Sequence, residues 1–249
     1  MNIFVCVSLV PDSTTKVKVS AEGKSIDENG VSYILNPYDE FAVEEAVQLK
    51  EKNGGEVTAV SFGTDKSKEA VKKAFQMGAD KGVLIKAESD NFDSYTAAKN
   101  LADFLRDKNA DIILFGKQSI DFDGLVVPSM VGEMLGIPSI NVVVKLDIDG
   151  NKVTAEKEVE GGKEIIESSM PVIIGAQKGL NEPRYPNLKS IMASKKKPVD
   201  EVPATYSGNA IDIIDMTLPA PKGEGKIMTD GAGSVPELVK LLREEAKVL

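Results

Sequence analysis

The chain of 249 residues has no histidine, no tryptophan and a single cysteine, Cys6. Because imidazole is missing, the sequence excludes Ser–His–Asp catalysis, histidine-ligated metal sites and histidine proton shuttles. One cysteine forms no disulfide within the chain and cannot assemble a cysteine cluster for zinc or iron–sulfur. Cys6 lies inside an apolar run, which favours a buried and unreactive thiol.

Positive charge in excess and long apolar runs are also absent. The 39 acidic residues outnumber the 30 basic ones, which gives a net charge of −9, whereas general binding to phosphate backbones needs a basic face. No apolar run approaches the ~18 residues of a membrane span, and the first residues lack the basic region of a signal peptide. We therefore expect a cytoplasmic protein that binds no nucleic acid and inserts into no membrane.

What the sequence does contain, up to residue 135, is an alternation of apolar runs and amphipathic stretches of helical period. The predicted strands cover residues 2–10, 56–62, 82–85 and 111–115, and the predicted helices cover residues 36–53, 66–77, 94–108 and 123–135. Strands that alternate with helices of this length are typical of βαβ units. The pattern predicts an α/β fold with a doubly wound, mostly parallel sheet that has helices on both faces.

The pattern changes after Gly136. Residues 139–147, 152–160 and 164–168 are predicted to form a small antiparallel insert, and Asp149-Gly150 is a strong hairpin signal. Residues 170–176 form another apolar strand, which could rejoin the main sheet. We therefore assign residues 1–200 to one α/β nucleotide-binding domain.

Residues 201–249 have a different composition. Up to residue 233 they are rich in proline, glycine and polar residues, which predicts an extended arm rather than a second domain. A terminal helix follows, with Leu238, Leu241 and Leu242 on one face. That face needs a surface to pack on, either the body of this chain or another chain.

In open α/β sheets, ligands bind at the carboxyl ends of the strands, near the point where the strand order reverses. Four segments reach such ends: residues 6–12, 36–39, 61–65 and 116–124. The last reads GKQSIDFDG; its glycines let backbone approach a ligand, and a helix start offers free N–H groups to an anion. Because neither GxxxxGK[ST] nor GxGxxG occurs, two interpretations stay open: a nucleotide phosphate site at 116–127, or an ordinary β–α turn.

The same loop offers little for catalysis. Asp121 and Asp123 could cap a helix or bind a ribose or amide, and we propose no metal ligand. Lys117 could act as a base only if it were desolvated, and no serine or threonine has an imidazole base. A binding or carrier protein is therefore favoured over an enzyme.

A second candidate site is the segment LNEPRYPNLKSIMASKKK at 180–197. It is a predicted loop with two prolines, and it combines apolar side chains with a basic run. These residues are Leu188, Ile191, Met192, Lys195, Lys196 and Lys197. Either the apolar residues pack on the chain's own body, or they anchor in a partner's pocket while the lysines steer an acidic partner.

Several segments together resemble one known family. These are VSLVPD at the start, LNPYDEFAVEEAVQLKE at 35–51, AFQMGADKG at 74–82, GKQSIDFDG at 116–124, AEKEVEGGKEIIESSMPVIIGA at 155–176 and the segment at 180–197. In order and over nearly the whole chain, they resemble the β subunit of electron-transferring flavoprotein. The resemblance implies an adenine-nucleotide α-hydrolase-like fold.

The resemblance also implies a function. The β subunit pairs with a larger α subunit that holds most of the FAD, and it binds a structural AMP itself. The heterodimer accepts electrons from acyl-CoA-type dehydrogenases, as in fatty acid β-oxidation, and passes them to electron-transferring flavoprotein quinone oxidoreductase. The resemblance implies no catalytic residue in this chain.

Carried over by position, the family's AMP site includes Cys6, Asn36, Pro37, Tyr38, Asp39, Phe62, Gly116, Lys117, Gln118, Ser119, Ile120, Asp121, Phe122, Asp123, Gly124, Leu125, Val126 and Val127. Leu188 matches the leucine that enters a dehydrogenase pocket, with Lys195–Lys197 beside it. Glu158 matches a glutamate that guides the mobile flavin domain of the α subunit. Residues 201–249 resemble the arm that wraps that subunit.

The sequence departs from the family at several positions. Leu125, Val126 and Val127 stand where polar residues are frequent, and Ser8 and Leu9 stand where a basic pair is frequent. Backbone N–H groups are therefore expected to bind the phosphate, together with Ser119 or Ser129. Gly175 stands where Thr, Ala, Cys or Ser is usual.

Two alternatives are kept. Some family members bind a second FAD in place of AMP and bifurcate electrons; their loop usually reads DGDTAQVGP, where this chain has DFDGLVVPS. The AMP type is therefore favoured. The alternative of another class is a stand-alone adenine-nucleotide sensor, which would have no need of the arm or of the segment at 180–197.

Overall fold

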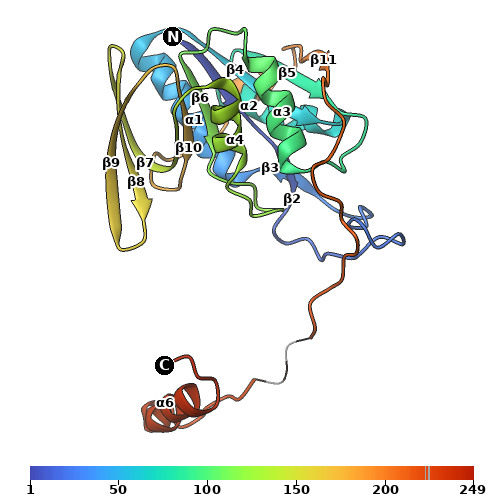
Figure 1. Ribbon diagram of the computed structural model, residues 1–249, viewed down its shortest axis with the longest axis vertical. Helices are drawn as coiled ribbons and strands as arrows, with labels where there is room; N and C mark the ends of the chain where they lie inside the picture. Colours follow the sequence, from blue (N-terminus) through green and yellow to red (C-terminus); the bar gives the residue numbers. More distant parts are fainter. Residues whose placement is uncertain (222, 224) are drawn as a thin grey trace. The chain divides into compact units, whose positions relative to one another are not determined.

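A computed structural model describes residues 1–221, 223 and 225–249. The chain divides into two compact units, Met1–Asp215 and Met216–Leu249. The first unit is built on a nine-stranded sheet with the order β11-β5-β4-β1-β6-β10-β7-β8-β9 (Figure 1). Its strands are β1 (Asn2–Cys6), β4 (Glu56–Gly63), β5 (Lys81–Lys86), β6 (Ile112–Gly116), β7 (Ser139–Asp149), β8 (Lys152–Val159), β9 (Gly162–Ser169), β10 (Val172–Ala176) and β11 (Asp200–Pro203).

Helices connect these strands. They are α1 (Pro37–Asn53), the 3-10 turn η1 (Asp65–Ser67), α2 (Lys68–Met77), α3 (Ser94–Leu105), α4 (Val127–Leu135) and α5 (Leu188–Ser194). A separate two-stranded sheet pairs β2 (Leu9–Pro11) with β3 (Tyr33–Leu35). From β11 to β7 all neighbouring strands of the large sheet are parallel, and only β7, β8 and β9 pair antiparallel. The predicted α/β class with a mostly parallel sheet is confirmed.

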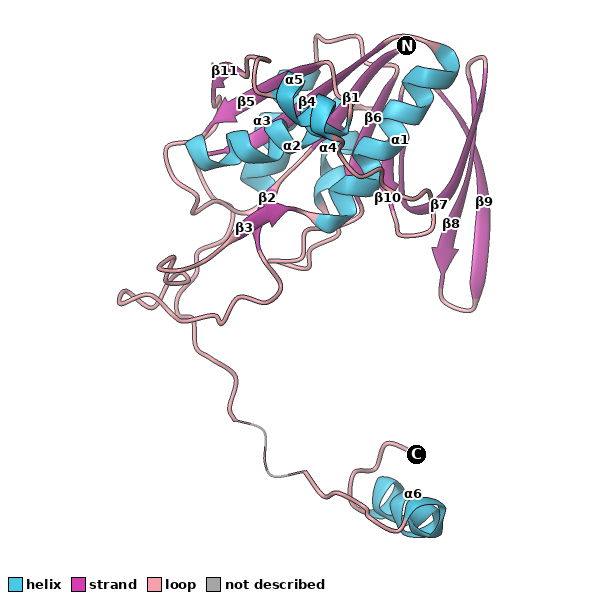
Figure 2. Ribbon diagram, turned by 180° about the vertical axis from the view of Figure 1, so that it is seen from behind, coloured by secondary structure: helices cyan, strands magenta, loops and turns pink. Residues whose placement is uncertain are grey.

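The alternating side chains of β1 fill two separate cores. Ile3 and Val5 belong to the core under α1 and α2, whereas Phe4 and Cys6 belong to the core under α3. Small residues at helical spacing, such as Ala42 and Ala46 of α1, let the helices lie close to the sheet. Figure 1 shows α3 and α4 in front of the sheet, and Figure 2 shows α1 and α5 on the opposite side.

The strand order fixes where a ligand can bind. The chain runs outward from β1 through β4 to β5 and then returns to β6, on the other side of β1. The point of reversal therefore lies between β1 and β6. In folds of this kind, the crevice beyond the carboxyl ends of those two strands is the usual ligand site.

The predicted antiparallel strands are present, and they continue the main sheet. β10 lies between β6 and β7 and pairs parallel with both, so the strand at 170–176 does rejoin the sheet. Through β7, the meander of β8 and β9 is attached as an extension of the same sheet.

Residues just beyond 200 also lie on the first unit, whereas the sequence places the arm from residue 201. β11 adds to the edge of the sheet beside β5. The Asn100 side chain, 1% exposed, then binds the next residues: its Oδ1 accepts from the N–H groups of Thr205 (2.8 Å) and Tyr206 (3.1 Å). The composition of residues 201–233 did not reveal that this segment binds to the first unit, because the contact depends on Asn100, which is far away in the sequence.

The second unit carries the 3-10 turn η2 (Gly231–Ser234) and the terminal helix α6 (Val235–Glu244), where the sequence predicts a helix. No residue of α6 is buried, and Leu238 is 44% exposed. Within this unit, Lys226 Nζ lies 2.8 Å from Glu237 Oε1. None of the described helices of the chain is long and apolar enough to span a membrane.

Candidate functional site

Three segments meet at the carboxyl ends of β1 and β6, and the Asp39 carboxylate joins them. Its Oδ2 accepts hydrogen bonds from the backbone N–H and the hydroxyl of Ser8, each at 2.8 Å. Its Oδ1 accepts from the Gly116 N–H at 3.1 Å and from Asn36 Nδ2 at 2.9 Å. The structure thus brings together the residues predicted at the end of β1, the start of α1 and the end of β6.

Asp39 is buried, with 5% of its surface exposed. Burial raises the pKa of this carboxyl from 3.8 to about 6, although the hydrogen bonds from Ser8, Asn36 and Gly116 act in the opposite direction. Cys6 is buried as well, as predicted. Burial raises the pKa of its thiol well above the ordinary value, and the nearby Asp39 charge raises this pKa further. The crevice therefore disfavours negative charge on both groups.

The sequence position of Asn36 suggested that its side chain caps α1, but the structure shows no such capping hydrogen bond. Its amide donates instead to Asp39 and, at 2.9 Å, to the carbonyl of Gln118. Asn36 is 1% exposed, and its Oδ1 has no hydrogen-bond partner among the described residues. A buried acceptor without a partner is rare in folded proteins, and it suits an N–H group of a bound molecule.

Gly116 is needed for this close packing. A Cβ atom at Gly116 would lie 2.4 Å from Asp39 Oδ1 and 2.6 Å from the backbone carbon of Tyr38. No larger residue fits there without moving the start of α1. The sequence predicts that glycine lets backbone approach a ligand; in the structure the groups that approach Gly116 are the Asp39 carboxylate and the Tyr38 backbone.

The loop from Lys117 to Val126 is longer than predicted, because α4 begins at Val127 rather than at residue 123. Asp121 and Asp123 therefore do not cap the helix. Asp121 Oδ1 accepts from the Phe122 N–H at 2.9 Å, and Asp123 accepts a hydrogen bond from the Gln118 side chain. The missed signal is Pro128, since proline is favoured in the first turn of a helix.

Side chains in this loop project toward solvent. Phe122 is 67% exposed, Leu125 41% and Val126 43%. The Lys117 ammonium lies 4.9 Å from the centroid of the Tyr38 ring, a cation–π contact. Ser119, Ile120 and Gly124, also predicted here, are partly buried.

Asn141 of β7 holds the loop, and the sequence reasoning missed it. Its Nδ2 donates to the carbonyls of Leu125 (3.1 Å) and Lys117 (3.3 Å). Its Oδ1 lies where a side chain at Gly175 would be, since a Cβ there would lie only 1.6 Å away. Glycine at 175 thus makes room for Asn141, whose side chain binds the loop. In the sequence, the unusual glycine at 175 was the one feature that could have indicated this contact.

Phe62 lies one strand farther out, on β4, and is 9% exposed. It shares an apolar core with Cys6 and Phe115, and its ring centroid lies 4.6 Å from that of Phe92. No metal site accompanies this crevice: the described residues contain no group of three or more Cys, Asp or Glu side chains placed to hold an ion.

The segment at 180–197, predicted as a loop, contains the short helix α5. The Asn187 side chain caps it by accepting from the Ser190 N–H at 2.9 Å. Leu188 is 76% and Met192 55% exposed, whereas Ile191 is half-buried. The exposed side chains are thus available on one short helix.

The three lysines after α5 do not behave alike. Lys195 and Lys196 are exposed. Lys197 instead donates to the Ala79 carbonyl at 2.6 Å and lies 5.3 Å from the Phe75 ring centroid. Lys197 is therefore part of the body of the protein and is not free to steer a partner.

Glu158 lies in a third place, on β8. It is exposed, and its Oε2 accepts from Gln177 Nε2 at 3.1 Å. No hydrogen bond or ion pair of the described residues joins Glu158 to the residues of the crevice.

A family model described as "Electron transfer flavoprotein domain" matches residues 24–207. An electron transfer flavoprotein subunit beta of Bacillus subtilis (strain 168) is 40% identical, over 100% of this chain and 100% of that protein. A subunit beta of Syntrophomonas wolfei is 38% identical over 100% of this chain and 98% of its own. One of Dictyostelium discoideum is 33% identical over 96% of this chain and 97% of its own.

Proposed function

The chain belongs to the electron transfer flavoprotein family as a β subunit, and from that premise we propose that it binds AMP in the crevice between β1 and β6. The observation that carries the proposal is the buried Asn36 Oδ1, which has no hydrogen-bond partner in the part of the chain that the structure describes. Adenine carries an amino group that can donate to such an acceptor.

The residues around Asn36 fit a nucleotide monophosphate. Lys117, whose ammonium lies beside the Tyr38 ring, adds a positive charge close to the start of α1. Leu125, Val126 and Val127 supply no polar side chains, so the loop's backbone N–H groups and the Ser119 hydroxyl would bind the phosphate. AMP would act here as a structural ligand that fills the crevice and orders residues 117–126.

We further propose that the chain acts with an α subunit as an electron carrier. That subunit would hold most of the FAD, and the flavin supplies the redox chemistry when bound. This chain would contribute the surface that a dehydrogenase of the acyl-CoA class recognises: the exposed Leu188 and Met192, with Lys195 and Lys196 beside them. An exposed apolar anchor beside basic residues is typical of a partner-binding surface. Electrons would leave to a quinone oxidoreductase, and Glu158 would guide the flavin-bearing domain.

The nucleotide content of the purified complex tests this function. The chain is co-expressed with its α subunit, the complex is denatured, and the released nucleotides are separated and quantified. One FAD and one AMP per complex are expected. Two FAD and no AMP would contradict the proposal and would indicate the electron-bifurcating type.

A further inference from the structure

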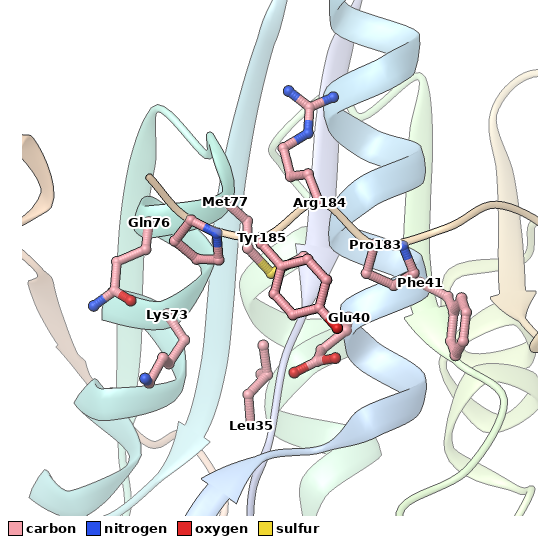
Figure 3. Close-up of a pocket in the computed structure, with 10 residues that line it drawn as sticks. Leu35, Glu40, Phe41, Lys73, Gln76, Met77, Pro183, Arg184 and Tyr185 are labelled. Carbon is pink, nitrogen blue, oxygen red and sulfur yellow. The ribbon is translucent and has the colours of Figure 1, made fainter. Parts of the chain in front are cut away.

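The segment that leads into α5 is fixed by one arginine. Arg184 Nε and Nη2 donate to the Glu44 carboxylate at 2.8 and 3.0 Å, and Nη1 and Nη2 donate to Glu51 at 2.7 and 3.0 Å. The Arg184 N–H also donates to Glu44 at 3.1 Å. Glu44 and Glu51 lie two turns apart on α1, so one guanidinium spans the helix face (Figure 3 shows Arg184 extended along α1).

The Glu44 side chain is 3% exposed, whereas that of Glu51 is 55% exposed. Burial acts to raise the pKa of Glu44, but the hydrogen bonds from Arg184 and Gln48 outweigh it and lower this pKa. Bidentate pairs of this kind fix geometry as well as adding energy. The buried Glu44 and the exposed Glu51 thus bind the same guanidinium from two sides.

A second contact adds to the first. Asn181 Nδ2 donates to Glu45 Oε2 at 2.8 Å and to the Phe41 carbonyl at 3.0 Å, both on α1. Figure 3 shows Pro183, Arg184 and Tyr185 crossing between α1 and α2. The approach to α5 is thus attached to α1 at two points before the exposed Leu188 is reached.

The chain is also held after α5. Lys197 donates to the Ala79 carbonyl that follows α2, and Ser194, the last residue of α5, is buried. A helix of seven residues is far below the ~12–15 residues at which isolated helices become marginally stable. Its structure and direction therefore depend on these attachments.

We propose that Arg184, through Glu44 and Glu51, is a positioning residue that orients α5 so that Leu188 and Met192 face a partner. The proposal rests on the docking role of this segment. A preformed helix binds without the entropic cost of ordering a loop at the moment of contact. The ion pairs of α1 would thus set the affinity for the dehydrogenase without contacting it.

Arg184→Ala is a poor test, because it leaves the buried Glu44 charge without a partner and can unfold the protein. Glu51→Gln weakens only the ion pair between Arg184 and the exposed Glu51. Arg184→Lys keeps the positive charge but removes the forked guanidinium. Glu182→Gln is the matched control, since it removes one exposed carboxylate from the same segment outside the Arg184 contacts.

The variants are purified as complexes with the α subunit. Two quantities are measured: the KM for the complex with an acyl-CoA dehydrogenase as electron donor, and amide hydrogen exchange over residues 183–194. For Glu51→Gln and Arg184→Lys we expect KM to rise roughly three- to tenfold with kcat unchanged, and exchange to become faster. Glu182→Gln should change neither quantity.

Faster exchange with an unchanged KM, or unchanged exchange, would overturn the positioning role. Leu188→Ala is measured in the same series to separate this from the docking function. If Leu188→Ala raises KM while the Arg184 and Glu51 variants do not, only the positioning role fails. If Leu188→Ala leaves KM unchanged, the docking function fails and the positioning role fails with it.

Discussion

The crevice between β1 and β6 and the segment at 180–197 are opposite kinds of surface. In the crevice, polar groups are buried, and one of them, Asn36 Oδ1, has no partner among the described residues. In the segment, apolar side chains are exposed, with Leu188 at 76%. A buried polar atom without a partner and a group of exposed large apolar side chains, here Tyr185, Leu188 and Met192, are informative exceptions to ordinary burial. The first points to a small polar ligand and the second to a protein.

The two regions also differ in how they are held. Asp39 joins the crevice from the inside, by four hydrogen bonds from Ser8, Asn36 and Gly116. The segment is attached to the body through Asn181 and Arg184 before α5 and through Lys197 after it, while Leu188 and Met192 stay exposed. Changes in the crevice should therefore affect stability and ligand together, whereas changes on α5 should affect binding to a partner alone.

The largest effect is expected from Gly116→Ala. The added Cβ would meet the Asp39 carboxylate and the Tyr38 backbone at 2.4 and 2.6 Å, which should cost about 3 kcal/mol of unfolding free energy and abolish AMP retention. Gly124→Ala is the control, because its Cβ meets nothing closer than 3.8 Å. Thermal unfolding and nucleotide content measure both effects. Equal stability of the two variants would show that the crevice is not closely packed around Asp39.

The next effect is a pH dependence confined to the crevice. Because the pKa of Asp39 is raised to about 6 in the folded state, its contribution to stability is fully present below pH 3.8 and is lost as the pH rises through 6. The difference of about two pKa units corresponds to roughly 3 kcal/mol at most. Asp39→Asn should therefore flatten the fall in unfolding free energy of the complex between pH 3.8 and about 6.

The control for this prediction is Asp121→Asn, which changes an exposed carboxylate in the neighbouring loop. It should retain the pH profile of the unaltered protein. If Asp39→Asn also retains that profile, the buried carboxyl does not titrate in this range and the electrostatic description of the crevice is wrong.

On α5 we expect a smaller and purely functional effect. Leu188→Ala should slow electron transfer from an acyl-CoA dehydrogenase about tenfold, the usual cost of removing one apolar anchor, with flavin content and unfolding temperature unchanged. Ile165→Ala, which shortens another exposed side chain on β9, should leave the rate unchanged. Loss of FAD from the Leu188 variant would mean that this residue belongs to the structural body of the complex.

The smallest effects separate two lysines that are adjacent in the sequence. Lys197→Ala removes the hydrogen bond to Ala79 and should lower the unfolding free energy by about 1 kcal/mol. Lys196→Ala should leave stability unchanged and weaken association with the dehydrogenase about twofold, only at low ionic strength. Rates at two salt concentrations, with thermal unfolding, distinguish the pair. The same response from both lysines would show that the hydrogen bond from Lys197 to Ala79 does not stabilise the protein.

Local patterns in the sequence predict most of this fold. The alternation of apolar strands and amphipathic helices gives the parallel sheet, because each core is built from side chains a few residues apart, as in Ala42 and Ala46. The strand order reverses at β1, and that places residues 6, 36–39 and 116 together, as the sequence predicts.

Contacts between distant residues could not be predicted in this way. Asn141 and Gly175 meet only because β7 and β10 are neighbours, and Asn100 holds Thr205 and Tyr206 across the sheet edge. Neither pair leaves a periodic signal. The start of α4 was missed for a different reason: Asp123 is a favourable capping residue by type, but it has a positive φ of 54° and its N–H bonds to the Ser119 carbonyl in a turn, so the helix begins only at Val127.

The most direct test of the account is the nucleotide content of the Asn36→Leu complex. Leucine has a similar volume but cannot accept a hydrogen bond, so the crevice loses the acceptor that we assign to adenine. We predict that AMP is lost while one FAD per complex is retained, which also shows that the complex has assembled. Retention of one AMP per complex would contradict the assignment of the AMP site to this crevice.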